Sequence, residues 1–325
     1  MTTVSSGPVA SHSSSITFRH NVTAAVLLIA ASAAQAQSDA DRCVAVSGTP
    51  DLAIQHCTRA IEFGKLAGEP LARLHYKRGI EWAAKSNYDR AIDDYDAALR
   101  LNPKFTDALY NRGNAWSGKG ESDRAIADYD AAIGVSPREP SAYIGRAVEL
   151  SVKGDYGRAV ADYDAAIALG GKAAMTLLGR GRARFYAGDF ARSAADLEQA
   201  LKLEPNGYTA LWLYLARKRG GAIDAEQQLE IDGRSDRSTG WPGTVIVLYL
   251  GRTDTDSVLA ASTNNDPRRR AAQRCEANFY LAHWYLLRGE RERALPLLKE
   301  AQAGCPKEFF EYEGTVAELR RLQKP

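Results

Sequence analysis

Charged side chains recur at a fixed spacing along the middle of the chain. An arginine occurs every 34 residues, and an aspartate follows each arginine within the same unit. Because an unpaired charge removed from water is costly, a periodic, half-buried arginine needs an anion beside it. We therefore expect a ladder of Arg–Asp ion pairs between helices. The four pairs are Arg78 with Asp94, Arg112 with Asp128, Arg146 with Asp162, and Arg180 with Asp196.

The same aspartates could instead bind a metal or run acid–base chemistry, since a further acid lies two residues after each of them. Residues two apart on a helix point about 200° away from one another, so the two carboxylates cannot converge on one ligand. Beyond residue 36 the histidines are His56, His75 and His283, which are far apart and have no metal-binding spacing. The sequence therefore predicts a protein that is not an enzyme, with no catalytic residue, no metal and no cofactor.

The four cysteines form two candidate pairs. Cys43 and Cys57 fall on the two arms of one predicted helical hairpin, and Cys275 and Cys305 fall on the arms of another. In an oxidising compartment such cysteines are bridged more often than free. We predict two disulfides, each of which would stabilise the fold by about 3 kcal/mol through loop closure in the unfolded chain.

A repeated segment explains this periodicity. Residues 87–99 recur at 121–133, at 155–167 and, more loosely, at 189–201, and prolines close three of the units at the same offset. The pattern resembles the tetratricopeptide repeat, in which small residues let two helices approach, aromatic residues fill the gap beside them, and a proline ends the second helix. The first full unit has Gly79, Trp82, Ala91, Tyr95, Ala98 and Pro103 at these positions, and the second has Gly113, Trp116, Ala125, Tyr129, Ala132 and Pro137.

The resemblance predicts an all-α fold: a tetratricopeptide-repeat α-solenoid of stacked antiparallel helical hairpins with a C-terminal capping helix. We divide the chain into a signal peptide (1–36), a divergent helical repeat (37–71), four repeats (72–207) and an irregular, repeat-like region (208–325). Within the last region, a hairpin is expected around Gly289 over residues 275–304. A polar-faced helix from Phe309 to Leu322 is expected to cap the array and to meet water.

The first 36 residues read as a secretory signal. Arg19 is their only strong base, and an apolar run from Val22 to Ala34, too short to cross a bilayer, ends in Ala34-Gln35-Ala36. We expect cleavage after Ala36 and a periplasmic or secreted protein with no later membrane span. Cys43 follows a polar stretch, which argues against a lipid anchor.

Charge argues against a nucleic-acid partner. The chain has 42 Lys+Arg and 40 Asp+Glu residues, and loss of the signal removes one arginine, so the mature net charge is 41 − 40 = +1. Such a balance offers no basic footprint for nucleic acid or for an anionic membrane.

Protein binding fits better, because stacked hairpins leave a concave groove lined by the first helix of each unit. Tyrosines with amide and cationic groups on that face suit an extended peptide or a helix. Asn111 and Asn114 with Lys77 resemble part of the carboxylate clamp of chaperone-tail-binding repeats, although the rest of that set is absent; ordinary groove polarity is the alternative. The predicted groove residues are Tyr76, Lys77, Tyr110, Asn111, Asn114, Arg182, Phe185 and Tyr186.

The C-terminal region adds a narrower resemblance. Its segments Trp241-Pro242, Tyr249-Leu250-Gly251, residues 275–281, Glu311-Tyr312 and Ala317-Glu318-Leu319 are similar to the NlpI-like envelope repeat proteins. The resemblance implies a dimeric adaptor that brings a peptidoglycan hydrolase to a protease, here without the lipid-modified cysteine. The alternative is a periplasmic peptide- or glycan-binding protein without an enzyme client.

Overall fold

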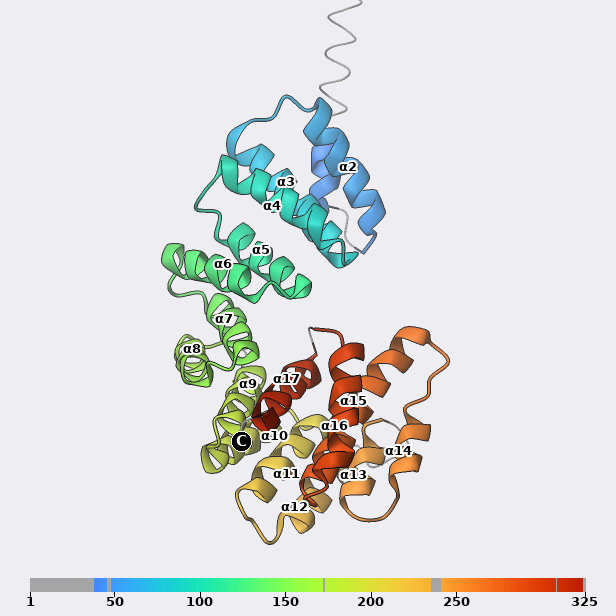
Figure 1. Cartoon of the computed structure of the whole chain (residues 1–325). Coiled ribbons are helices and arrows are strands. Elements are labelled where there is room, and N and C mark those ends of the chain that lie inside the picture. Colours follow the sequence, from blue (N-terminus) through green and yellow to red (C-terminus); the bar gives the residue numbers. More distant parts are fainter. Residues whose placement is uncertain (1–37, 46–47, 172, 235–240, 308, 324–325) are drawn as a thin grey trace, which may run out of the picture. The chain divides into compact units, whose positions relative to one another are not determined.

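The computed structural model describes residues 38–45, 48–171, 173–234, 241–307 and 309–323 (Figure 1). The predicted signal peptide, residues 1–36, lies outside them. The described residues are helices and connecting turns, which confirms the all-α prediction, and none of their helices is long and apolar enough to cross a membrane. The chain forms two compact units, residues 1–103 and 104–325. The boundaries drawn from the sequence at 71/72 and 207/208 stay a prediction.

The N-terminal unit contains a helical segment at 38–45 and the helices α2 (Pro50–Phe63), α3 (Gly68–Ala84) and α4 (Tyr88–Leu101). Helices α3 and α4 form the first full repeat. A Cβ atom on Gly79 would lie 2.6 Å from Tyr95 Cε1, so only a glycine lets α3 approach the buried tyrosine of α4 this closely. The Asn87 side chain caps α4 by accepting a hydrogen bond from the backbone N–H of Arg90.

The C-terminal unit begins with three regular hairpins, α5 (Thr106–Lys119) with α6 (Ser122–Val135), α7 (Pro140–Lys153) with α8 (Tyr156–Ala168), and α9 (Ala173–Tyr186) with α10 (Phe190–Leu203). Four less regular helices follow: α11 (Gly207–Arg219), α12 (Ala225–Asp232), α13 (Gly243–Tyr249) and α14 (Thr255–Ala261). The unit ends with the hairpin α15 (Pro267–Leu286) and α16 (Arg291–Gly304), then α17 (Phe310–Gln323). The hairpin expected around Gly289 is therefore present, and its first helix begins earlier than expected.

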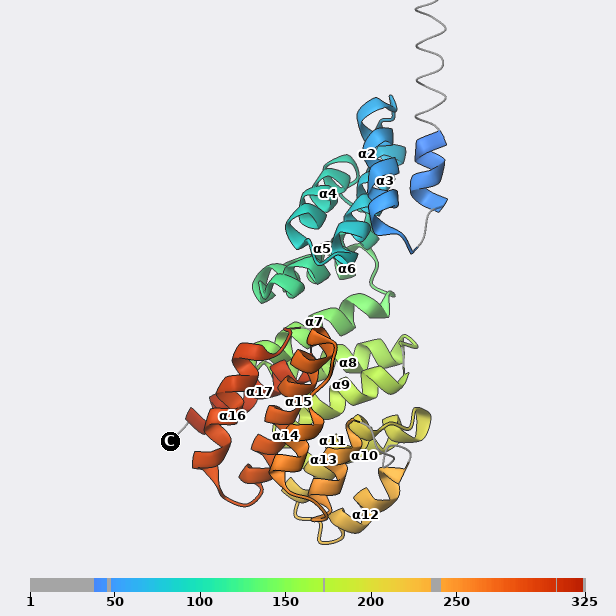
Figure 2. The ribbon, with the colours of Figure 1, turned by 90° about the vertical axis from the view of Figure 1, so that its right-hand side faces the viewer.

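The terminal helix forms where it was predicted, but its polar face does not meet water. Helix α17 packs on α7, α15 and α16, as Figures 1 and 2 show. Glu311, Glu313 and Glu318 are 5%, 3% and 0% exposed. The expectation of a solvated polar face was wrong because acidic residues of α17 find partners on other helices, including Arg182 for Glu313 and Arg219 for Glu318.

Candidate binding site

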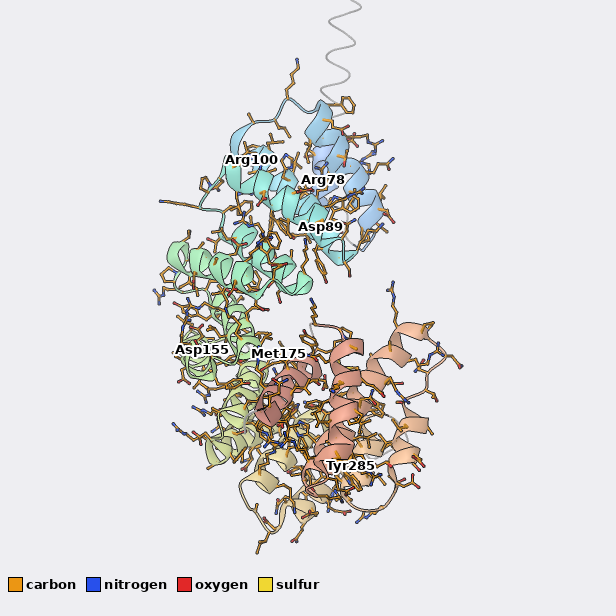
Figure 3. All side chains as sticks on the ribbon, in the orientation of Figure 1. Arg78, Asp89, Arg100, Asp155, Met175 and Tyr285 are labelled. Atoms are coloured by element: carbon orange, nitrogen blue, oxygen red, sulfur yellow. A yellow bond between two sulfur atoms is a disulfide. The ribbon has the colours of Figure 1, made fainter. Side chains whose placement is uncertain are left out.

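The Arg–Asp ladder is present in both units and fixes the spacing of the two helices of each hairpin. In the N-terminal unit, Arg78 donates from Nε and Nη2 to the two carboxylate oxygens of Asp94, each at 2.8 Å; Figure 3 labels this arginine. In the C-terminal unit the equivalent bonds measure 2.6–3.0 Å. These bidentate, charge-assisted hydrogen bonds are strong and directional. The prediction of an Arg–Asp ladder is confirmed.

In two of the repeats the second acid also has a structural role. Asp130 accepts a hydrogen bond from Arg146 Nη1, and Asp164 accepts one from Arg180 Nη1, each at 2.5 Å. The arginine of one hairpin therefore holds its own aspartate and also the second acid of the preceding hairpin. Each of these half-exposed carboxylates is thus already paired with an arginine.

Glycines of the second and third repeats position an aromatic side chain of the second repeat. Cβ atoms on Gly113 and Gly145 would each lie 2.7 Å from the Tyr129 ring, so this ring is clamped between α5 and α7. Burial raises the pKa of Tyr129, which stays a neutral hydroxyl donor and donates to Asn114 Oδ1 at 2.8 Å. The Tyr110 ring lies 5.9 Å from it. Two predicted groove residues, Tyr110 and Asn114, are thus held by a buried neighbour.

These two residues line a pocket of about 260 Å³ that we call the α5–α7 pocket. Its wall opposite the repeats comes from the segment 307–313, excluding residue 308. Polar groups in the wall include Glu149, which is 4% exposed and accepts from Ser117 Oγ at 2.5 Å, and Lys307, which donates to the backbone oxygen of Lys119 at 3.1 Å. The lining residues are Tyr110, Asn114, Ser117, Gly120, Ser122, Tyr129, Ile144, Gly145, Val148, Glu149, Val152, Lys307, Phe309, Phe310, Tyr312 and Glu313.

The prediction that Arg182 and Phe185 line an open groove was wrong. Arg182 is 0% and Phe185 1% exposed. Helix α17 lies over Arg182, whereas the Phe185 ring packs against Phe190, Trp212 and His283 of α10, α11 and α15. The Arg182 guanidinium donates from Nη2 to Glu313 Oε2 at 2.7 Å and stacks 3.6 Å above the centre of the Phe310 ring. A Cβ atom on Gly314 would lie 2.5 Å from the Tyr186 hydroxyl, so Tyr186 is also packed against α17.

The remaining predicted groove residues are each tied to neighbours. In the N-terminal unit, the half-buried Tyr76 ring lies 6.1 Å from Tyr95, and Lys77 Nζ lies 3.6 Å from Glu81 Oε1, one turn along its own helix. In the C-terminal unit, Asn111 accepts from the Asn114 amide at 3.4 Å. Lys77 is thus already paired, which weakens the carboxylate-clamp interpretation.

Both predicted cysteine pairs are bridged in the structure, with Cα–Cα distances of 4.8 Å for Cys43–Cys57 and 4.9 Å for Cys275–Cys305. The second bridge packs with Ala301 against Phe309 and Tyr312. It therefore supports the segment that forms one wall of the α5–α7 pocket.

Chemistry of other kinds has little support in the described part of the chain. There, no group of three His, Cys, Asp or Glu side chains could hold a metal ion. His56 bonds Asp39 at 2.7 Å and His75 bonds Asp94 at 2.9 Å. His283 is fully buried among aromatic rings, and that burial lowers its pKa well below the usual value.

Comparison with known proteins agrees with the fold. A tetratricopeptide-repeat family model matches residues 76–140, 117–174 and 178–216. A tetratricopeptide repeat protein from Parabacteroides merdae superposes with a TM-score of 0.54 at 16% identity, covering 88% of this chain and 97% of that one.

Two further solved structures are similar at lower TM-scores. One is the C-terminal part of a repeat protein from Cytophaga hutchinsonii, with a TM-score of 0.49 at 18% identity, covering 82% of this chain and 94% of that one. The other is MamA from Desulfovibrio magneticus, with a TM-score of 0.48 at 19% identity, covering 53% of this chain and 95% of that one. The chain has the all-α tetratricopeptide-repeat fold, and its repeats indicate a protein–protein interaction scaffold.

Proposed function

We propose that this protein is an exported adaptor that binds a segment of a partner protein in the α5–α7 pocket. The observation that carries the proposal is the pocket itself, whose two walls come from the repeats and from the distant segment after α16. Aromatic anchors beside a few fixed polar groups are typical of sites that bind peptides.

The chemistry of the pocket suits an extended peptide. Ile144, Val148 and Val152 give one wall an apolar stripe along α7, against which a partner's apolar side chain can pack. Asn114 is exposed and offers an amide to a peptide backbone, and Lys307 adds a cation at the rim. The Arg–Asp ladder keeps the helices in place, so the pocket is formed before the partner arrives.

Export is the second part of the proposal. The signal-like segment at 1–36 supports it, and the two disulfides are of the kind that persists in oxidising compartments. The similarity of the C-terminal segments to NlpI-like proteins suggests envelope clients, among them peptidoglycan hydrolases and a periplasmic protease, and a homodimer. Mass spectrometry of the exported, unreduced protein should find a chain beginning at Gln37 and the two bridged peptides. Four free thiols would contradict the disulfides, and an intact segment 1–36 would contradict cleavage after Ala36.

Site-specific photo-crosslinking tests the pocket. A photoreactive amino acid is placed at Asn114 in the α5–α7 pocket or at the exposed Ala131 on α6, outside it. In intact cells we expect a discrete protein adduct from position 114 and none from position 131. Val148→Arg should remove the adduct by filling the pocket, whereas Val135→Arg, on the exposed end of α6, should leave it unchanged.

Equal adducts from both positions, or an adduct that survives Val148→Arg, would remove the α5–α7 pocket from the proposal. A third outcome would support a glycan-binding protein without a protein client. In that case no adduct forms, the wild-type protein is retained on purified peptidoglycan, and Val148→Arg is not retained.

A further inference from the structure

A second cavity, of about 360 Å³, lies in the C-terminal unit between α9, α11, α15 and the start of α17. We call it the glutamate pocket. It shares Phe309 and Phe310 with the α5–α7 pocket, so the two adjoin. Neither the repeats nor the proposed function accounts for its chemistry. Its lining residues are Leu178, Asn206, Tyr208, Trp212, Glu276, Phe309, Phe310 and Glu311.

Glu276 is fixed in the wall of this cavity by hydrogen bonds to one of its two carboxylate oxygens. The residue is 8% exposed. The Tyr208 hydroxyl donates to its Oε2 at 2.8 Å, and the Trp241 indole N–H donates to the same oxygen. No donor from the described residues reaches Oε1. Burial raises the pKa of this carboxyl, as expected for a charge moved away from water.

Glu311 is the second acid of the cavity. It is 5% exposed, and its Oε1 accepts a hydrogen bond from the Tyr280 hydroxyl at 3.2 Å. Burial, and then the charge of Glu276, raises the pKa of Glu311 to about 7. The nearby Arg182 bonds Glu313 instead. Within the described ranges, no Lys, Arg or His forms an ion pair with Glu276 or Glu311.

Aromatic rings complete the cavity. Trp212 is 1% exposed, whereas Phe310 is 37% exposed and stands at the opening. Two carboxylates that form no ion pair among the described residues, beside apolar rings, match a cation on an apolar stem. The carboxylates accept its N–H groups and the rings pack on its stem; Arg182 already covers one face of Phe310. An anion would be repelled. A divalent metal ion is a poor fit because only two carboxylates and no imidazole line the cavity.

We propose that the glutamate pocket binds a lysine or arginine side chain of a protein partner. Such a side chain supplies the missing counterion, and its methylene stem packs on Phe309, Phe310 and Leu178. This proposal rests on the proposed function in one respect: the side chain that binds belongs to a partner protein. The preference for a cation comes from the cavity alone.

Model ligands test the cation chemistry directly on the mature full-length protein. Binding of N-acetyl-lysine amide, N-acetyl-arginine amide and the uncharged N-acetyl-norleucine amide is followed by NMR at pH 8. We expect the two cations to bind at least about tenfold more tightly than the norleucine derivative. Equal binding of all three would overturn the proposal, and a preference between the two cations would identify the side chain.

Two pocket variants and one control locate the binding. Glu311→Gln keeps the shape of the side chain and removes its charge, so cation affinity should fall about tenfold. Phe310→Ala removes a ring and keeps both acids, so affinity should fall while its pH dependence remains. Glu198→Gln, at a half-exposed acid outside the cavity that pairs with Lys202, should change nothing. Unchanged cation binding in Glu311→Gln would place the ligand elsewhere and overturn the proposal.

The pH dependence supplies a readout that packing alone would not give. The titratable groups facing Glu311 are Arg182 from α9, Tyr208 from α11, and Glu276 and Tyr280 from α15. Among these groups Glu311, whose pKa is raised to about 7, changes charge near neutrality. Cation affinity should therefore fall about tenfold from pH 8 to pH 6 in the wild-type protein and much less in Glu311→Gln. A wild-type affinity independent of pH would contradict the proposal. Because crosslinking at Asn114 does not depend on this cavity, the two proposals can fail separately.

Discussion

The regular hairpins α5–α10 and the irregular region α11–α17 treat buried charge in opposite ways. In the hairpins, each buried aspartate has an arginine within 2.6–3.0 Å from the neighbouring helix of its own repeat. In the irregular region, Glu313 pairs with Arg182 across 131 residues, and Glu276 and Glu311 pair with no cation of the described residues. Charges that follow the 34-residue period pair within the repeats, whereas Glu276, Glu311 and Glu313, which depart from it, line the two pockets.

The largest effect is expected from breaking the long-range pair. Glu313→Gln leaves Arg182 buried without its counterion, which should lower the free energy of unfolding by about 3–5 kcal/mol. The double variant Arg182→Met/Glu313→Gln removes both charges and should recover much of that loss. Urea unfolding measures both. A loss in the single variant no larger than that of the half-exposed control Glu198→Gln would show that α17 does not depend on this pair.

The unpaired acids should make stability depend on pH in a direction opposite to that of a paired aspartate. The pKa of Glu311 rises from an ordinary 4.5 to about 7 in the folded protein, so the folded state holds its proton more tightly than the unfolded state. Stability is therefore lost as pH rises from about 4.5 to about 7, by up to about 3 kcal/mol.

Comparison of the wild-type protein with Glu311→Gln isolates this contribution. Their unfolding free energies in urea should be similar at pH 4.5 and should differ at pH 8 by up to about 3 kcal/mol in favour of the variant. A difference independent of pH would mean that Glu311 does not titrate in this range. A saturating lysine derivative should reduce the difference at pH 8, because it restores a counterion to the wild-type acid.

Packing inside the regular hairpins should respond more moderately. Gly145→Ala places a Cβ atom 2.7 Å from the clamped Tyr129 ring and should lower the free energy of unfolding by about 1–3 kcal/mol. Gly134→Ala, on α6 with nothing within 4 Å of the added carbon, should instead raise it by up to about 1 kcal/mol. Thermal or urea unfolding distinguishes the signs, and equal effects of the two changes would contradict the clamp.

The sequence predicts the contacts of the regular hairpins, because the interacting residues there are close along the chain. The spacing of Arg146 and Asp162 places both on one hairpin, so their pairing follows from the repeat alone. Glu313 and Arg182 follow no period, and no local rule links residues so far apart. For the same reason Tyr110 could be placed on the inner side of the repeats. The segment after α16, which covers Arg182 and supplies the other wall of the α5–α7 pocket, could not be placed in this way.

The smallest loss of stability is expected from breaking an ion pair that joins one hairpin to the next. Asp130 is half exposed, so Asp130→Asn should cost only about 0.2–1 kcal/mol, whereas Asp162→Asn, which weakens the buried bonds within a hairpin, should cost about 1.5–3 kcal/mol. Urea unfolding gives both values, and raised salt should shrink only the first. If the two substitutions cost the same, stacking of the hairpins depends on charge as much as their internal packing does. The irregular region would then differ from the regular one only in where its partners lie along the chain.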